Sequence, residues 1–268
     1  MRKSLTAWVL SLLAMAVFSS TLHGQTTGGA AASKSQGTPG DLTGLWLRPR
    51  VSKHIDQARR FDRQQPPMTA WAEAKFKATQ DMYKQATGKA VLDRLSGGDP
   101  TYSCFPPGVP GIYFHVTGDG RPMEIIPAKG RILEFFEYDH FVRQMWTDGR
   151  EHPKDLAATW MGDSIGKWEG DTLVVDSIGF NDKTVLDGAG HPHSEDLHVV
   201  ERMRRLDKDT LEVNLTITNP KAYTQPWGGQ LIFVLAPSDW TVMEDICEDN
   251  ATFIDFIKKA NAEPKQSK

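Results

Sequence analysis

Histidines and carboxylates concentrate in one short stretch of this chain, His191-Pro192-His193-Ser194-Glu195, with His198 just beyond it. In an extended chain the side chains of His191, His193 and Glu195 project to the same side, a spacing able to hold a divalent metal ion. The glycines that flank the stretch predict a loop, and the alternative is an exposed loop whose histidines bind nearby backbone groups. A divalent metal at His191 and His193 is therefore one hypothesis, and no other cofactor is indicated.

A second polar loop reads Asp148-Gly149-Arg150-Glu151-His152. Asp-Gly is a common turn pair, so a simple turn explains this loop without any function. If the two polar loops meet at one end of the fold, Asp148, His152, His191 and His193 surround its opening. In that arrangement Asp148 and His193 are candidates for acid–base catalysis.

The outline of a hydrolase nucleophile motif occurs at Gly162-Asp163-Ser164-Ile165-Gly166. That motif requires a strand before the serine and a helix after it. Here a hairpin follows Ser164, so the match is predicted to be accidental. The sequence contains no phosphate-binding loop and no dinucleotide fingerprint.

The elements that must position these residues are strands, which begin near Ile112 and continue to about Cys247. Residues 131–137 and 140–146 predict a hairpin. A two-residue turn between them places Glu134 directly opposite Arg143 on an otherwise apolar face, where each charge needs the other.

Two more hairpins follow. A Gly170-Asp171 turn pairs Trp168 with Leu173. Residues 197–206 and 210–218 pair in the register that gives one continuous apolar face. That register leaves Glu201 on the apolar face opposite Leu215, where a carboxylate must find a partner, shift its pKa upward or line a wet cavity. Glu201 is the third candidate for acid–base catalysis.

A last strand pair is predicted at residues 231–236 and 240–247, which places Glu244 on an inner face. Trp227 follows a proline and lies near Tyr223, so both aromatic residues are candidates for a pocket wall. With Glu134, Arg143 and His152, these residues complete the set expected to contact a ligand.

The predicted fold class is mainly β, an antiparallel meander that closes into a lipocalin-like barrel, because successive hairpins of about eight strands tend to close. An open sandwich is the alternative. Residues 69–87 predict an N-terminal helix that packs on the sheet or covers its end. Its apolar stripe comprises Trp71, Ala74, Ala78 and Met82.

Four segments are expected along the 268 residues. Residues 1–24 have the charged start and short apolar run of a secretory signal peptide; an uncleaved membrane anchor is the alternative. Residues 25–40 predict a flexible linker, 41–260 a single barrel-like domain and 261–268 a polar tail. The expected location is the periplasm or the outside of the cell, with no membrane span after signal cleavage.

Charge and cysteine content restrict the partners. A formal net charge of −3 with interleaved acidic and basic residues gives no basic face for nucleic acid. In an oxidising compartment the two cysteines, Cys104 and Cys247, are expected to form a disulfide; two separate buried thiols are the alternative.

One long motif runs from Trp160 to Asp176, WMGDSIGKWEGDTLVVD, and continues through Gly179-Phe180-Asn181-Asp182 to Gly190-His191-Pro192-His193-Ser194. It resembles a family of exported bacterial proteins abundant in soil organisms, over about residues 42–248. The resemblance implies export and a shared architecture, and it transfers no catalytic residue. Gly44-Leu45-Trp46 is similar to the opening of lipocalin-type barrels.

Three functions are compatible with this sequence. The leading hypothesis is an exported β-barrel that binds a small molecule in a pocket lined by Glu134, Arg143, Glu201 and aromatic side chains. The second is a hydrolase, lyase or isomerase that uses carboxylate and histidine acid–base chemistry, with or without a metal. The third is a structural envelope protein with a solid interior.

Overall fold

The computed structural model describes residues 40–49, 64–85, 104–116 and 121–247. The predicted signal peptide, all but the last residue of the predicted linker, and the polar tail lie outside these residues. Among the described residues, no helix has the length and apolar character needed to cross a membrane.

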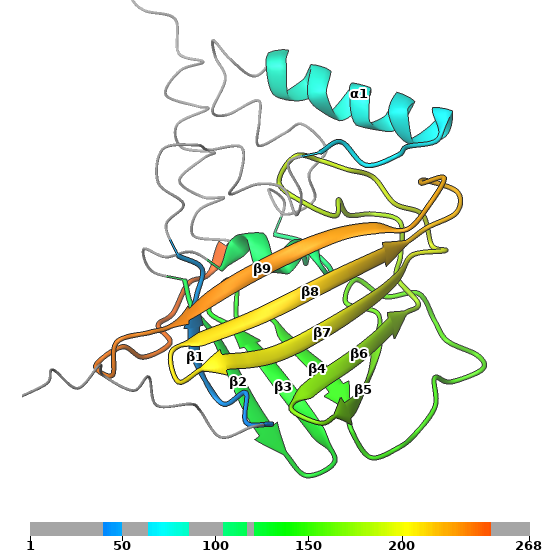
Figure 1. Ribbon diagram of the computed structural model, residues 1–268. Coiled ribbons are helices and arrows are strands. Elements are labelled where there is room, and N and C mark those ends of the chain that lie inside the picture. The colour runs from blue at the N-terminus through cyan, green and yellow to red at the C-terminus, as the bar shows by residue number, and fades with distance from the viewer. Residues whose placement is uncertain (1–39, 50–63, 86–103, 117–120, 248–268) are drawn as a thin grey trace, which may run out of the picture. The chain divides into compact units, whose positions relative to one another are not determined.

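Nine strands form a closed barrel in which each strand pairs with the next and the last pairs with the first (Figure 1). The strands are β1 Gly44–Leu47, β2 Met123–Ala128, β3 Arg131–Phe136, β4 Val142–Trp146, β5 Asp163–Glu169, β6 Thr172–Ile178, β7 His198–Asp207, β8 Thr210–Thr218 and β9 Trp227–Leu235. The predicted mainly β barrel with a helix before most of its strands is confirmed. One pair departs from a simple meander, because β4 and β5 are parallel.

The three hairpin registers predicted from the sequence are the observed ones. Glu134 pairs with Arg143 between β3 and β4, and Trp168 pairs with Leu173 between β5 and β6. Glu201 pairs with Leu215 between β7 and β8. Because side chains alternate between the two faces of a strand, these registers fix which residues enter the barrel.

The predicted final hairpin is wrong. β9 already begins at Trp227 and closes the barrel by pairing with both β8 and β1. After Pro237 the chain leaves the barrel, and residues 240–247 contribute an isolated bridge between Tyr138 and Asp245 in place of a strand. Glu244 is consequently exposed and does not lie on an inner face.

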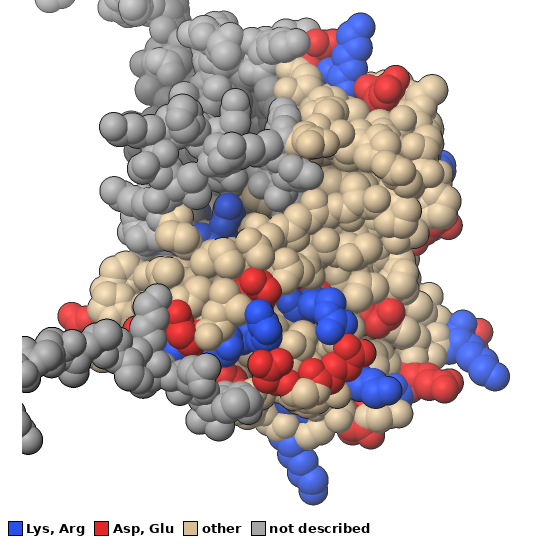
Figure 2. All heavy atoms as spheres, viewed as in Figure 1, with Lys and Arg blue, Asp and Glu red and all other residues tan. Residues whose placement is uncertain are grey.

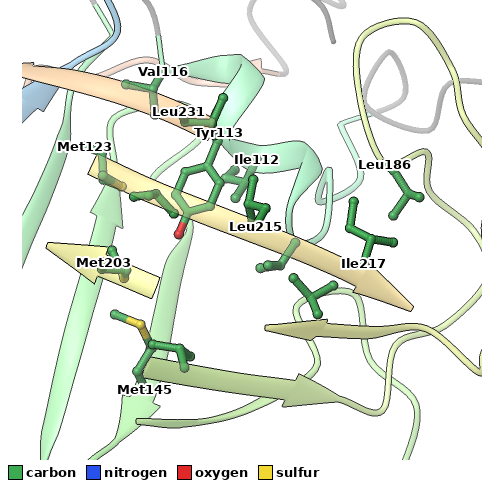
Figure 3. Close-up of a cluster of buried hydrophobic side chains, with 14 of the residues drawn as sticks. Ile112, Tyr113, Val116, Met123, Met145, Leu186, Met203, Leu215, Ile217 and Leu231 are labelled. Atoms are coloured by element: carbon green, nitrogen blue, oxygen red, sulfur yellow. The ribbon is translucent and has the colours of Figure 1, made fainter. Parts of the chain in front are cut away.

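Apolar side chains from the strands fill most of the barrel interior. Trp46 of β1 is fully buried, and its Nε1 donates a hydrogen bond to the carbonyl oxygen of Leu42 at 3.0 Å. A short 3₁₀ segment, η3 (Gly111–His115), adds two buried side chains, Ile112 and Tyr113. Figure 3 shows Tyr113 reaching from η3 into this core.

The helix α1 (Ala70–Gln85) begins at the predicted cap, where Thr69 Oγ1 accepts a hydrogen bond from the Ala72 amide at 3.3 Å. Of its predicted apolar stripe, Trp71 is half-buried and packs against the core, whereas Ala74 and Ala78 are exposed.

The contact face also contains Ala72, which is fully buried, and Phe76, which stacks on His191 at a centroid distance of 4.6 Å. Gln80 of the same face donates a hydrogen bond to the carbonyl oxygen of Ala189 at 2.6 Å.

A disulfide joins Cys104 to Cys247 with a Cα–Cα distance of 5.5 Å, as expected for an oxidised pair. The bond spans 143 residues of sequence and attaches the segment before η3 to the end of the described chain. In the chain-entropy model a loop of this length stabilises the fold by roughly 5 kcal/mol.

Acidic and basic side chains are interleaved on the outer surface. On the face drawn in Figure 2, Lys and Arg lie beside Asp and Glu without forming a continuous basic area. Arg202 of β7, for example, pairs with Glu169 of β5 at 3.0 Å.

Candidate functional site

Three charged side chains meet inside the barrel, and we call Glu134, Arg143 and Glu201 the Glu–Arg–Glu cluster. Glu134 and Glu201 have an exposure of 0% and Arg143 of 2%. β3, β4 and β7 each place one of them on the inner face, between apolar neighbours such as Val199 and Met203. The registers that align the apolar residues therefore also bring these charges together.

Arg143 lies at the centre of the cluster. Its Nη1 donates to Glu134 Oε2 and to Glu201 Oε1, each at 3.1 Å, and its Nη2 forms a short bond with Glu201 Oε2. Two buried serines, Ser164 of β5 and Ser177 of β6, lie 3.1 and 3.0 Å from Nη2. Ser164 lies in β5, and the β5–β6 hairpin follows it in place of the helix that a hydrolase motif requires, as predicted. Its hydroxyl group contributes to this network.

Tyr113 of η3 completes the network. Its hydroxyl group lies 2.9 Å from Glu134 Oε1 and 2.7 Å from Glu201 Oε1, and it accepts a hydrogen bond from Arg143 Nη1 at 3.0 Å. One phenolic proton can serve only one of the two carboxylates. A second proton, carried by a glutamate, completes the hydrogen bonding among these three oxygens.

Glu134 is the group suited to carry that proton. Burial raises its pKa, Arg143 lowers it and the charge of Glu201 raises it again, with a result of about 7. With both glutamates ionised the cluster has one negative charge in excess, and protonation of Glu134 makes it neutral. Burial and the two carboxylates raise the pKa of Tyr113 far above its usual value, so its hydroxyl stays protonated.

The ring of Tyr113 occupies the space beside the cluster. It packs against Phe136 and Phe233 at centroid distances of 6.1 and 5.7 Å. In Figure 3 its hydroxyl oxygen points toward the part of the interior lined by Met203 and Met145. The charged groups of the Glu–Arg–Glu cluster thus all contact the hydroxyl group of Tyr113.

His191 and His193, the two histidines predicted as metal ligands, lie in the connection between β6 and β7. We call residues 184–193 the histidine loop. His191 Nδ1 is 2.7 Å from Asp187 Oδ2. His193 Nε2 is 2.7 Å from Thr184 Oγ1, and its Nδ1 is 3.2 Å from the carbonyl oxygen of Ser194. Burial lowers the pKa of His193 to about 4, so this ring is neutral near pH 7.

The two histidines therefore have separate partners. In the part of the chain that the structure describes, no group of three or more His, Cys, Asp or Glu side chains is arranged to hold a metal ion.

A small pocket of about 30 Å³ lies between η3 and the histidine loop. Its lining includes His115 of η3, together with Thr184 and Asp187, the hydrogen-bond partners of the two loop histidines. Burial, with a smaller effect from Arg121, lowers the pKa of His115 to about 4. A pocket of this size holds about one water molecule or one hydroxyl group.

His152 belongs to a different, partly exposed group. Its Nδ1 is 2.6 Å from Asp163 Oδ1 and its Nε2 is 3.0 Å from Asp176 Oδ1. His198 Nε2 approaches the other oxygen of Asp176 at 2.9 Å. Asp163 and Asp176 were not among the predicted site residues, although the β5–β6 register places them near each other.

The remaining predicted residues are dispersed. Asp148 forms an exposed pair with Arg150 at 2.6 Å, and the hydrogen bond from Arg150 lowers the pKa of Asp148. Asp148, His152, His191 and His193 thus have different partners. Tyr223 is buried and donates to the carbonyl oxygen of Pro192 at 2.7 Å. Trp227 packs on Tyr223 at 5.0 Å.

Like Asp163 and Asp176, the residues Tyr113 and Asp187 were not predicted from the sequence as site residues. Tyr113 enters the barrel from a segment without strand periodicity. The sequence contains one weak indication of a role for Asp187, since this residue precedes His191 by four positions in a Gly-rich loop.

Comparison with known proteins finds no family model, no curated protein and no solved structure that matches this chain.

Proposed function

We propose that this protein is an exported small-molecule-binding barrel whose ligand contacts the Glu–Arg–Glu cluster. The observation that carries the proposal is the complete burial of three charged side chains on the inner face of the barrel. The resemblance to exported soil-bacterial proteins and to lipocalin-type barrels forms part of the same proposal. A disulfide of this kind is typical of proteins in oxidising compartments and supports export.

Stability alone does not account for such a cluster. Transferring two carboxylates and a guanidinium from water to the barrel interior has a large desolvation cost. Replacing such a buried group of charges by apolar residues of similar volume often leaves a fold equally stable or more stable. The interior already holds apolar residues from the strands, so further apolar residues at these positions would extend the same core. Charged groups retained at such a cost favour a role in recognition or catalysis.

The contacts of Tyr113 indicate the chemistry of the ligand. Its hydroxyl group donates to a carboxylate and accepts from Arg143, while its ring packs between Phe136 and Phe233. A ligand that replaces Tyr113 needs a hydroxyl group with the same two roles and an apolar body of similar size. Because Tyr113 belongs to η3 and not to a strand, moving it leaves the barrel hydrogen bonds intact.

The test is to purify the full chain from its native compartment, denature it and identify released small molecules by mass spectrometry. Glu134→Gln keeps the shape of the cluster and changes its charge, so we expect its ligand content to fall. Glu124→Gln, on β2 and outside the cluster, is the control and should retain the wild-type amount. Equal amounts of every released compound in wild type and Glu134→Gln would overturn the proposal.

The second candidate function is acid–base catalysis of a hydrolase, lyase or isomerase type. The observation that favours it is the pKa of about 7 for Glu134, which allows this group both to donate and to accept a proton near neutral pH. The two functions differ in what happens to the compound identified above. An enzyme converts it to product at a rate that depends on Glu134, whereas a binding protein releases it unchanged.

A further inference from the structure

Tyr113 reaches the Glu–Arg–Glu cluster from a segment outside the strands, residues 104–116, which we call the tyrosine strap. In the described part of the chain, none of its residues forms a β-bridge. The backbone amides of Ile112 and Tyr113 donate to carbonyl oxygens of the strap itself. Moving the strap therefore breaks no strand pairing of the barrel.

Side-chain contacts hold the middle of the tyrosine strap in place. Ile112, Tyr113 and Val116 belong to the buried core (Figure 3). Arg48, which follows β1, donates from Nη1 to the carbonyl oxygen of Tyr113 at 3.4 Å. The guanidinium of Arg48 also lies 4.7 Å from the centroid of the Phe114 ring. All these contacts are non-covalent, so they can break and form again without a chemical reaction.

The disulfide attaches the first residue of the strap to another part of the protein. Cys104 is bonded to Cys247, whose backbone amide donates to Asp139 Oδ1 at 3.1 Å. The Asp139 amide in turn donates to the carbonyl oxygen of Asp245 at 2.8 Å. The far end of the bond is thus fixed to the connection between β3 and β4. Since only a short length of chain separates Cys104 from Tyr113, the bond limits how far Tyr113 can move.

The tyrosine strap therefore has two covalent anchors. One is the disulfide, and the other is the peptide chain that leads from Val116 to β2. Without the disulfide, the nearest described element before the strap is α1, which ends at Gln85. A longer chain between two anchors has more conformations, so loss of the bond favours states with Tyr113 outside the cluster.

Occupation of the cluster by Tyr113 weakens the binding of any ligand that needs the same contacts. The apparent affinity falls in proportion to the fraction of molecules in which the site is open. We propose that the Cys104–Cys247 disulfide keeps Tyr113 in the cluster, and that reduction by a dithiol releases the strap and opens the cluster to its ligand. This inference rests on the function proposed above for the barrel interior.

The reduction is an ordinary thiol–disulfide exchange. Cys104 is half-buried and Cys247 is 7% exposed, so the reductant attacks the sulfur atom of Cys104. The first thiol of the dithiol loses its proton to water and forms a bond to this sulfur, while Cys247 leaves as a thiolate and takes a proton from water. The second thiol reacts in the same way with the mixed disulfide and releases Cys104. The dithiol supplies two electrons and becomes a disulfide itself.

Hydrogen–deuterium exchange of the full chain, measured by mass spectrometry, tests the release of the strap without any ligand. The protein is compared before and after reduction with dithiothreitol, and circular dichroism monitors the strands. We expect the amides of the strap to exchange about tenfold faster after reduction, and those of β7 and β8 to change much less. An equal change in both regions, no change in the strap, or loss of the strands on reduction would overturn the proposal.

A double variant shows whether the reductant acts through this bond. Cys104→Ser combined with Cys247→Ser should give the exchange of the reduced protein, with or without dithiothreitol. A further rise after addition of dithiothreitol to the double variant would mean that the reductant acts elsewhere, and this result would contradict the assignment.

Ligand access is measured by calorimetry with 4-methylphenol, which has the ring and hydroxyl group of a tyrosine side chain and fits the volume that Tyr113 leaves. Toluene, which lacks the hydroxyl group, is the matched compound and should bind more weakly. Reduced wild type should bind 4-methylphenol roughly tenfold more tightly than oxidised wild type. Tyr113→Ala, which lacks the internal occupant, should bind it equally in both redox states.

The calorimetric results separate this inference from the proposed function. Binding to Tyr113→Ala together with equal affinities of oxidised and reduced wild type would overturn control by the disulfide and leave the ligand site in place. Absence of binding to folded Tyr113→Ala would refute the proposed ligand chemistry, and with it the opening of the cluster to a ligand.

Discussion

Glu134 and Arg143 lie directly opposite each other on β3 and β4, and inside the barrel Arg143 Nη1 is 3.1 Å from Glu134 Oε2. Glu201 reaches the same guanidinium from β7, which is not a neighbour of either strand. One cation thus serves two carboxylates across the barrel, and the stability of the fold depends on that sharing.

Removing the cation should therefore be costly. Arg143→Met leaves two carboxylates buried together, and we expect the free energy of unfolding at neutral pH to fall by about 3–5 kcal/mol. Urea denaturation followed by circular dichroism measures it. Arg150→Met, in an exposed pair, should leave the urea midpoint unchanged. A similar midpoint for Arg143→Met would mean that Arg143 does not compensate the two carboxylates.

Glu134 should make the protein less stable as the pH rises. Its pKa is about 7 in the folded protein against an ordinary value of 4.5, so the folded state binds the extra proton between these values. Its contribution is present below pH 4.5 and is lost through pH 7, with a slope of at most about 1.4 kcal/mol per pH unit. Glu134→Gln should lack this slope. The difference between the two urea-unfolding profiles isolates the effect, and parallel profiles would refute it.

His193 should have the opposite effect. Its pKa is about 4 when folded against 6.5 ordinarily, so the unfolded state binds the extra proton in this window. The contribution is present above pH 6.5 and is lost as the pH falls to 4, again by at most about 1.4 kcal/mol per unit. His193→Gln should have a flatter acid limb in urea unfolding. NMR titration of the His193 ring checks the same pKa directly, and a value near 6.5 would exclude the effect.

Gly228 allows β9 to approach β8 closely. A Cβ at this position would lie 1.9 Å from the carbonyl oxygen of Leu215, which is backbone and cannot rotate away. We expect Gly228→Ala to lower the melting temperature, with a destabilisation of about 1–3 kcal/mol from overpacking. Gln230→Ala, exposed on the same strand, is the control. A wild-type melting temperature for Gly228→Ala would show that the two strands can separate at this point.

The inner faces of the hairpins were predictable because a period of two residues and a known turn together fix the register. For Glu134, Arg143 and Glu201, the register predicted that each side chain lies on the inner, apolar face and that its buried charge needs a partner. That the three residues share one site followed from the predicted closure of the barrel and not from pairing alone, because closure brings β7 across from β3 and β4.

Other features depend on tertiary contacts that leave little trace in the sequence. The contact face of α1 is set by Phe76 on His191, not by the most apolar stripe. Near its start, directly after Trp227, β9 has two glycines, Gly228 and Gly229, which are poor strand formers, so the apolar run from Leu231 suggested too late a start. Glu244 was misplaced because the same error moved the following segment into a strand.

The bond between Cys104 and Cys247 turns the chain between them into a covalent ring that contains every strand except β1. A peptidase that cuts any single connection inside this ring produces a nicked protein and no free fragment. The two new ends remain attached through the sulfur atoms, and the strands on either side stay in register. In any oxidising compartment, where disulfides persist, the two parts of the cut chain would therefore stay joined, whereas an unbridged chain would be divided.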